Sequence, residues 1–420
     1  MLTRLRSLIA SVVVVAALIA AACGTPESIT SPTLTALPRP LTSAEATLIA
    51  ADNRFAFTLL RAVDQETRDT LPNLFVSPLS VAMALGMTYN GAAGTTEEAM
   101  RRTLELEGMS LSEVNEASRS LIALLRGLDP GVRFLIGNSI WYREGFAVEQ
   151  PFLDANRTYF DAEVAALDFA SPAAPQRIND WVTRRTQGLI TEIVPSPIPE
   201  GAVMYLINAI YFKGDWTQRF DRERTKPAPF HLADGSTVQV PMMRSATPLR
   251  LRASRNADFE VAELPYGGQA FSMIVVMPRD PAALDTLVAG FTAERWNDWV
   301  ARLDTTSLDV SLPKFRLVND LTLVSPLKTL GMGIAFDCLP PEMADFTRMH
   351  RPQEACITNV KHKTYVDVNE EGTVAAAVTS VEMGIVSVQP SIVIDRPFLF
   401  AIRERLSGTI LFLGAIRNPS

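Results

Sequence analysis

Residues 369–390 decide the fold, and they read NEEGTVAAAVTSVEMGIVSVQP. The stretch opens with two carboxylates and a glycine, and it then runs from Thr373 to Met383 without glycine or proline. Side chains along a strand point alternately to opposite sides, so the stretch has two faces. One face is uncharged and mostly small: Thr373, Ala375, Ala377, Thr379, Val381 and Met383. The other face comprises Val374, Ala376, Val378, Ser380 and Glu382. The segment can therefore lie in a sheet with its first face buried.

The alanine-rich start of this stretch has low intrinsic strand propensity, so little holds it as an ordinary core strand. A segment that can form a strand without being compelled to do so fits a mobile loop that later inserts into a sheet. The alternative from this window alone is an amphipathic strand of a β-rich enzyme.

The segment EEGTVAAAVT at 370–379 resembles the hinge of the serpins, the serine-protease inhibitor family, whose exposed reactive loop inserts into a central sheet after cleavage. A Pro-Phe pair follows the loop in that family, and Pro397-Phe398 matches it. The resemblance assigns the hinge to Glu370, Glu371, Gly372, Thr373, Ala375, Ala376 and Ala377. The family's usual loop length, counted from Gly372 or back from Pro397, places the reactive bond between Val386 and Ser387. The alternative is a shift of a few residues, which puts Ile385 or Met383 at the bond and favours broader or chymotrypsin-like proteases.

Further blocks extend the resemblance over about Leu48 to Pro419. They include NLFVSPLS at 73–80, YLINAIYFKGDW at 205–216 and PKF at 313–315. The resemblance implies an α+β serpin fold with three β-sheets, about eight or nine helices and an exposed reactive-centre loop. It also implies a buried polar cluster of Ser77, Ser80, Asn208 and His362. The alternative for the histidine is a lone core residue satisfied by backbone.

The whole chain fits one large domain or two ordinary ones, at 420 residues with 47% hydrophobic side chains. Its net charge is −7, and Lys and Arg are scattered, so we expect no nucleic-acid partner. We expect the serpin domain to span 43–420 and to be monomeric.

The first 22 residues have the pattern of a signal peptide. Arg4 and Arg6 precede an apolar run from Leu8 to Ile19 that is short for a membrane span. The following AAAC at 20–23 resembles the cleavage box of bacterial lipoproteins, which predicts lipidation of Cys23. Ala20 departs from the leucine usual in that box, so plain secretion and a retained membrane helix remain alternatives.

Residues 23–42 are rich in Pro, Ser and Thr, which predicts a flexible tether. The protein is then extracytoplasmic, and either contacts the membrane only through the N-terminal lipid anchor or is secreted. Two further cysteines, Cys338 and Cys356, predict a disulfide in an oxidising compartment, with two unpaired thiols as the alternative. The sequence has no Cys-x-x-Cys and no His/Cys cluster, so we predict no metal site and no cofactor.

The chemistry-bearing residues do not indicate an enzyme. Ser77 lacks the Gly-x-Ser-x-Gly elbow, and none of the three histidines has a hydrolase-type neighbour pattern. We expect an inhibitor of serine endopeptidases that acts as a suicide substrate and forms a covalent acyl complex with its target. Valine at the bond suits a shallow apolar pocket, which predicts elastase-like or subtilisin-like targets. A non-inhibitory serpin acting as carrier or chaperone is the main alternative, and an unrelated exported enzyme is the other.

Overall fold

The computed structural model describes residues 33–352, 355–373 and 390–420. These ranges hold nine α-helices and strands in three sheets, which confirms the predicted α+β class. The helices are α2 (Ser43–Thr67), α3 (Pro78–Tyr89), α4 (Gly94–Thr103), α5 (Leu111–Leu125), α6 (Gln150–Phe160), α7 (Ala173–Arg185), α8 (Leu284–Ala289), α9 (Ala293–Ala301) and α10 (Val324–Leu327). None of the described helices is both long enough and apolar enough to cross a bilayer.

The longest sheet has the strand order β1-β16-β15-β9-β8-β7-β10-β6-β5, and β14 pairs with β10. Its strands are β1 (Asn73–Val76), β5 (Phe220–His231), β6 (Thr237–Ser245), β7 (Leu249–Arg255), β8 (Phe259–Tyr266), β9 (Phe271–Pro278), β10 (Asp304–Pro313), β14 (Ser391–Val393), β15 (Phe398–Glu404) and β16 (Ile410–Ile416). Strands β9, β15 and β16 are buried along their whole length, because nearly every side chain in them is apolar.

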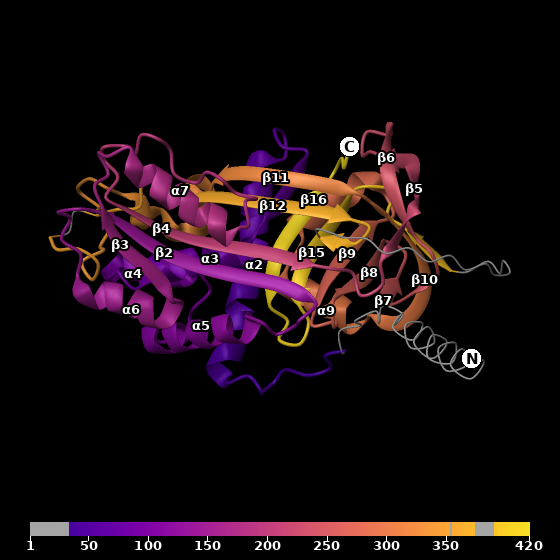
Figure 1. Ribbon diagram of the computed structural model, residues 1–420, viewed down its shortest axis with the longest axis horizontal. Helices are drawn as coiled ribbons and strands as arrows, with labels where there is room; N and C mark the ends of the chain where they lie inside the picture. The colour runs from indigo at the N-terminus through magenta and orange to yellow at the C-terminus, as the bar shows by residue number, and fades with distance from the viewer. Residues whose placement is uncertain (1–32, 353–354, 374–389) are drawn as a thin grey trace, which may run out of the picture.

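The two smaller sheets lie side by side in Figure 1. One has the order β3-β2-β4, made of β2 (Val132–Arg143), β3 (Ala162–Leu167) and β4 (Met204–Gly214). The other has the order β11-β12-β13, made of β11 (Phe315–Thr322), β12 (Lys361–Asn369) and β13 (Gly372–Thr373). Helix α7 covers β2 and β4 from one side, and α3 packs against β4 from the other.

Helix starts follow ordinary capping chemistry. Thr42 and Glu45 form a capping box at the start of α2, and Ser110 and Glu113 form another at α5. Ser77 caps α3, whose first residue is proline. Ser77 is therefore fixed where β1 turns into α3, beneath the two smaller sheets.

The structure differs from the predicted tether over its last residues. Leu34 and Leu41 pack against the core, and the Leu34 N–H donates to the Gly268 carbonyl over 2.7 Å. Arg39 pairs with the buried Glu45 and donates to Ser120 Oγ at 2.7 Å. Apolar side chains and an ion pair between the partly exposed Arg39 and the buried Glu45 therefore hold 34–41 on the domain. The predicted signal peptide and the Cys23 lipidation site lie outside the described residues.

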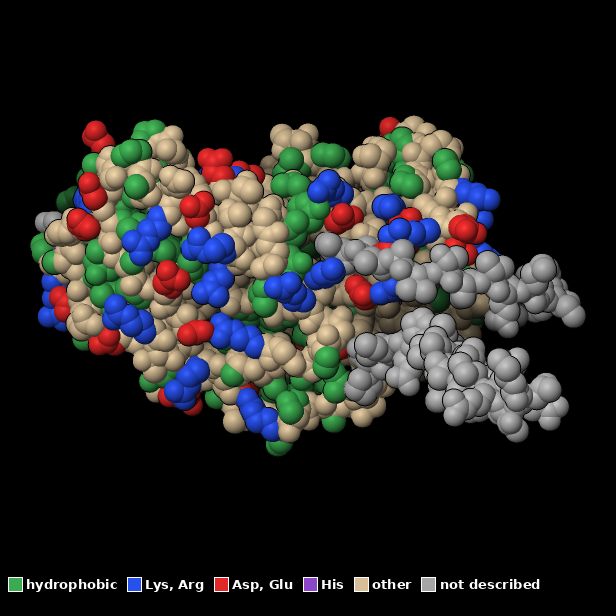
Figure 2. Space-filling view, viewed as in Figure 1, with side chains coloured by type: hydrophobic (Ala, Val, Ile, Leu, Met, Phe, Trp, Pro, Cys, Tyr) green, Lys and Arg blue, Asp and Glu red, His purple; other side chains and the backbone are tan. Residues whose placement is uncertain are grey.

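Charged side chains are spread over the face seen in Figure 2, with Asp and Glu among the Lys and Arg. The scattered cations of the sequence thus stay scattered among the described residues of this face. Two predicted features of the loop lie outside the described residues: hinge positions Ala375, Ala376 and Ala377, and the bond between Val386 and Ser387.

Candidate functional site

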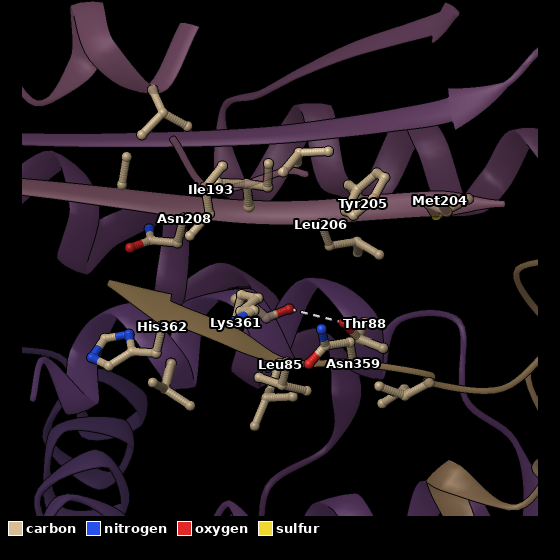
Figure 3. A pocket seen from close by; sticks show the side chains of 18 of the residues that line it. Leu85, Thr88, Ile193, Met204, Tyr205, Leu206, Asn208, Asn359, Lys361 and His362 are labelled. Atoms are coloured by element: carbon tan, nitrogen blue, oxygen red, sulfur yellow. Dashed lines mark hydrogen bonds between the residues drawn. The ribbon is translucent and has the colours of Figure 1, made fainter. Parts of the chain in front are cut away.

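A cavity of about 750 Å³ separates β4 from β12, and we call it the slot. One side wall is formed by residues 203–212, which belong to β4 and the residue before it. The other is formed by residues 355–365, which include the segment leading into β12 and the first half of that strand. Helix α3 lines it with Leu85 and Thr88, and Figure 3 shows Leu206 and Asn208 projecting from β4 toward the β12 side. The slot therefore lies between the two smaller sheets, over α3.

Along the slot, β4 and β12 each pair with another strand only on the side that faces away from the slot. Strand β4 pairs with β2, and β12 pairs with β11. Among the described residues they are linked only at one end, where β13 pairs with β12 and Gly372 forms an antiparallel bridge with Asp215 at the end of β4. An unpaired strand edge presents N–H and C=O groups to an incoming strand. The slot thus offers two such edges facing each other.

The four residues of the predicted polar cluster all line the slot. The Ser77 N–H donates to His362 Nε2 at 3.0 Å, and Ser77 Oγ donates to the Leu411 carbonyl at 2.9 Å. Ser80 Oγ lies 3.4 Å from the Asn208 carbonyl, which it reaches as donor. Figure 3 shows Asn208 and His362 on opposite walls, from β4 and β12. The Ser80 N–H also donates to Ser77 Oγ at 3.4 Å, so the cluster is one hydrogen-bonded network with Asn208 on one side of the slot and His362 on the other.

Asn138 extends the polar cluster on the β4 side of the slot, and it was not predicted from the sequence. Asn208 Nδ2 donates to Asn138 Oδ1 at 2.7 Å, while Asn138 Nδ2 donates to the Phe160 carbonyl at 2.7 Å. An asparagine inside the apolar run FLIGNSIW was the available signal, because a buried amide needs partners. Asn208 Oδ1 is buried and has no hydrogen-bond partner among the described residues.

Burial lowers the pKa of His362 to about 4, because the charged imidazolium loses its hydration inside the protein. The ring is therefore neutral at physiological pH. Its Nε2 accepts from the Ser77 N–H, so the proton is on the other ring nitrogen.

The two hinge carboxylates are buried and paired. Glu370 meets Lys314 Nζ at 3.0 Å, and Glu371 pairs with Arg222. Burial alone raises the pKa of Glu370, but hydrogen bonds from backbone, Lys314 and Thr225 together with the lysine charge bring it below its usual value. Glu370 is therefore ionised, and ion pairs hold both hinge carboxylates in place. Lys314 and Arg222 were not predicted, because their partnership with the hinge is tertiary.

Trp216 holds the hinge backbone. Its Nε1 donates to the Asn369 carbonyl at 2.9 Å, and its backbone N–H donates to the Glu371 carbonyl at 2.8 Å. Gly372 has φ +148°, and a Cβ there would overlap the Gly214 carbonyl. Only glycine fits so close to the neighbouring strand. This explains in physical terms why the hinge turns at Gly372.

Cys338 and Cys356 are joined by a disulfide in the structure, and Cys356 also lines the slot. Within the described ranges, no three His, Cys, Asp or Glu side chains lie close enough together to hold a metal ion.

The comparisons with known proteins agree with this geometry. The family model described as serpin (serine protease inhibitor) matches residues 50–419. Mouse glia-derived nexin (Mus musculus) is 33% identical over 358 residues, covering 83% of this chain and 88% of that protein. The pig leukocyte elastase inhibitor (Sus scrofa) is 33% identical over 383 residues, covering 89% of this chain and 99% of that protein.

Two solved structures have the same fold. The native state of tengpin, a thermophilic serpin, has a TM-score of 0.79 at 27% identity, covering 93% of this chain and 97% of that one. Human thyroxine-binding globulin in complex with its ligand also has a TM-score of 0.79, at 29% identity, covering 90% of this chain and 100% of that one. This chain belongs to the serpin family, as the hinge sequence predicted.

Proposed function

We propose that this protein inhibits serine proteases by inserting its cleaved reactive loop into the slot between β4 and β12. The observation that carries the proposal is the match between the slot and the sequence that follows Thr373. The pairing of β13 with β12 and the Gly372–Asp215 bridge place the start of the loop beside one end of the slot, and two strand edges border the slot.

The register of the first hinge residues supports the match. Thr373 is opposite Val368 on β12, and Gly372 is opposite Asp215 on β4. Continuing both pairings brings Ala375 between Val366 and Phe212, two buried side chains. The small face of the loop, Thr373, Ala375, Ala377, Thr379, Val381 and Met383, then points inward over its whole length. The face that includes Glu382 points to water.

The same count, made separately along each wall, brings Thr379 opposite His362 on β12 and opposite Asn208 on β4. Thr379 carries a hydroxyl, and Asn208 Oδ1 is a buried acceptor without a partner among the described residues. A threonine hydroxyl can donate to that oxygen and so satisfy both groups. The polar cluster then receives the inserted loop, with Thr379 between Asn208 and His362.

The chemistry belongs to the target. A serine protease attacks the loop carbonyl and forms an acyl-enzyme. Cleavage releases the loop, which inserts as a strand and carries the protease along with it before deacylation. Filling both unpaired edges and burying the small face makes the inserted state the more stable one, so the uncleaved protein stores free energy. The protein then needs no catalytic group, metal or cofactor of its own.

The target class follows from the bond between Val386 and Ser387. A small β-branched side chain fills a shallow apolar pocket and leaves a deep one empty, which favours elastase-like or subtilisin-like proteases over trypsin-like ones. One relative, 33% identical, is named leukocyte elastase inhibitor. The second candidate function is that of a carrier, favoured by the likeness to thyroxine-binding globulin.

The N-terminus places this inhibitor outside the cytoplasm. The signal-peptide pattern of residues 1–22 supports export, and the AAAC box supports a bacterial lipoprotein anchored at Cys23. Residues after Cys23 connect that anchor to the domain, which Leu34 contacts through its N–H bond to the Gly268 carbonyl. The alternative is a secreted monomer without the anchor.

Comparing the unfolding of intact and loop-cleaved protein tests the proposal. Insertion requires the cleaved form to unfold at a markedly higher temperature or urea concentration than the intact form. An equal or lower midpoint would show that the loop does not enter the slot.

A further inference from the structure

The Cys338–Cys356 disulfide lies at the end of the slot far from the hinge. Cys356 lines the slot where the chain approaches β12. Cys338 follows the short helix at Gly333–Phe336, in the connection that leaves β11 through α10. The disulfide thus joins the approach of β12 to the connection after its neighbour β11.

This approach is not paired as a strand. Thr358 and Asn359 are exposed, and strand β12 begins only at Lys361. Two backbone hydrogen bonds flank them: the Ile357 N–H donates to the Ala335 carbonyl at 2.9 Å, and the Leu323 N–H donates to the Val360 carbonyl at 2.9 Å. The 356–360 edge is therefore held by these two bonds, by the disulfide and by the packing of Ile357 and Val360 against the core.

The opposite wall is held differently at the same level. Met204 is paired with Tyr142 in the β2–β4 ladder, and the Arg143 N–H donates to the Val203 carbonyl at 2.9 Å. One wall of the far end is thus a regular strand pair. The other is an irregular edge tied by a covalent bond.

The register places the last inserting residues at this end. Continuing from Thr373 opposite Val368, Val381 comes opposite Val360, and Met383 comes opposite Thr358. These residues enter last, while the protease is still attached to Val386 in the proposed mechanism. The irregular 356–360 edge must accept them before the acyl-enzyme hydrolyses.

We infer that the Cys338–Cys356 disulfide is a positioning element for the inhibitory reaction, because it holds the 356–360 edge ready for the last residues of the inserting loop. The inference rests on the proposed function. Without the disulfide, the edge samples more conformations, so the final step of insertion slows. More acyl-enzyme then hydrolyses, and the protein is consumed as an ordinary substrate. The initial attack on the loop is unchanged, because it precedes insertion.

The test uses the C338S/C356S variant of the full chain, with C23S as the control that keeps the disulfide. Three quantities are measured against an elastase-like protease: the association rate, the inhibitor consumed per protease inhibited, and the urea unfolding midpoint. We expect the consumption ratio to rise about threefold or more in C338S/C356S, at an unchanged association rate. The C23S variant should match the wild type in both.

Wild-type protein reduced after folding, with two free thiols verified by mass, gives an independent measurement if the variant folds poorly. The same rise in the consumption ratio is expected. A purely structural disulfide would lower the unfolding midpoint and leave the ratio unchanged, and that result would overturn the inference. Failure of this inference can be distinguished from failure of the proposed function. If the proposed function is wrong, the oxidised wild type forms no covalent complex with the protease.

Discussion

Asp215, just beyond the end of β4, forms an antiparallel bridge with Gly372, the residue at which the loop hinge turns. Gly372 is also paired with Asn369 in the β12–β13 hairpin. Gly372 thus already pairs with β12 and with the residue that follows β4, the two strands that border the slot. A strand that begins in this register needs no search for its partners, and the pairing can extend residue by residue once the loop is cut.

Arginine on the inward face of the loop should abolish inhibition. Ala375→Arg requires a guanidinium to enter between Phe212 and Val366, which costs several kcal/mol. We expect the variant to be cleaved as a substrate without trapping the protease. Ala376→Arg is the matched control, because position 376 is on the opposite face of the loop and comes between Tyr211 and Tyr365, whose rings can contact a cation. Equal trapping by both variants would contradict the assignment of the two faces.

Thr379→Val should weaken the inserted state while leaving the uncleaved protein nearly unchanged. Valine keeps the shape but cannot donate to Asn208 Oδ1, so a buried acceptor stays unsatisfied after insertion. We expect the cleaved form to lose about 1 kcal/mol or more of unfolding free energy. Urea unfolding of cleaved wild type and cleaved variant measures the difference. Ser380→Val, on the outward face, should have little effect.

Acidification should destabilise the intact protein through His362. Burial lowers its pKa to about 4, whereas an unfolded histidine titrates near 6.5. The unfolded state therefore binds the proton first, and stability falls as pH drops from about 6.5 to 4, by up to about 3 kcal/mol. His362→Gln should lose this pH dependence.

Asp52 gives the folding stability a pH dependence of the opposite sign. Burial raises its pKa to about 7, so the stability that it contributes is lost as pH rises through that value. It is present in both proteins, so the difference between wild type and His362→Gln isolates the histidine. Urea unfolding of both proteins between pH 4 and 8 measures it. Parallel pH profiles would mean that His362 is not the titrating group.

The reactive bond is expected between Val386 and Ser387. An elastase-like protease should release a C-terminal fragment that starts at Ser387, which N-terminal sequencing identifies. Val386→Arg should shift inhibition toward trypsin-like proteases, since a deep charged pocket is then filled. A fragment starting at another residue, or stronger inhibition of trypsin by the wild type, would contradict the assignment.

The sequence predicted much of the fold because the serpin blocks are local and specific. The hinge signature EEGTVAAAVT led to the family, and the Ser77–His362 contact follows from the predicted cluster. The partners Arg222, Lys314 and Asn138 were not predicted, since each reaches its site from a segment distant in sequence. The packing of 34–41 was missed because proline-rich composition indicated a free tether, while Leu34 and Leu41 were enough to hold it.

Incubation with an elastase-like serine protease, followed by boiling in detergent and gel electrophoresis, tests the central claim most directly. The account predicts a band that contains both the protease and this protein, together with loss of protease activity. The result that would contradict it is cleaved inhibitor alone beside a fully active protease.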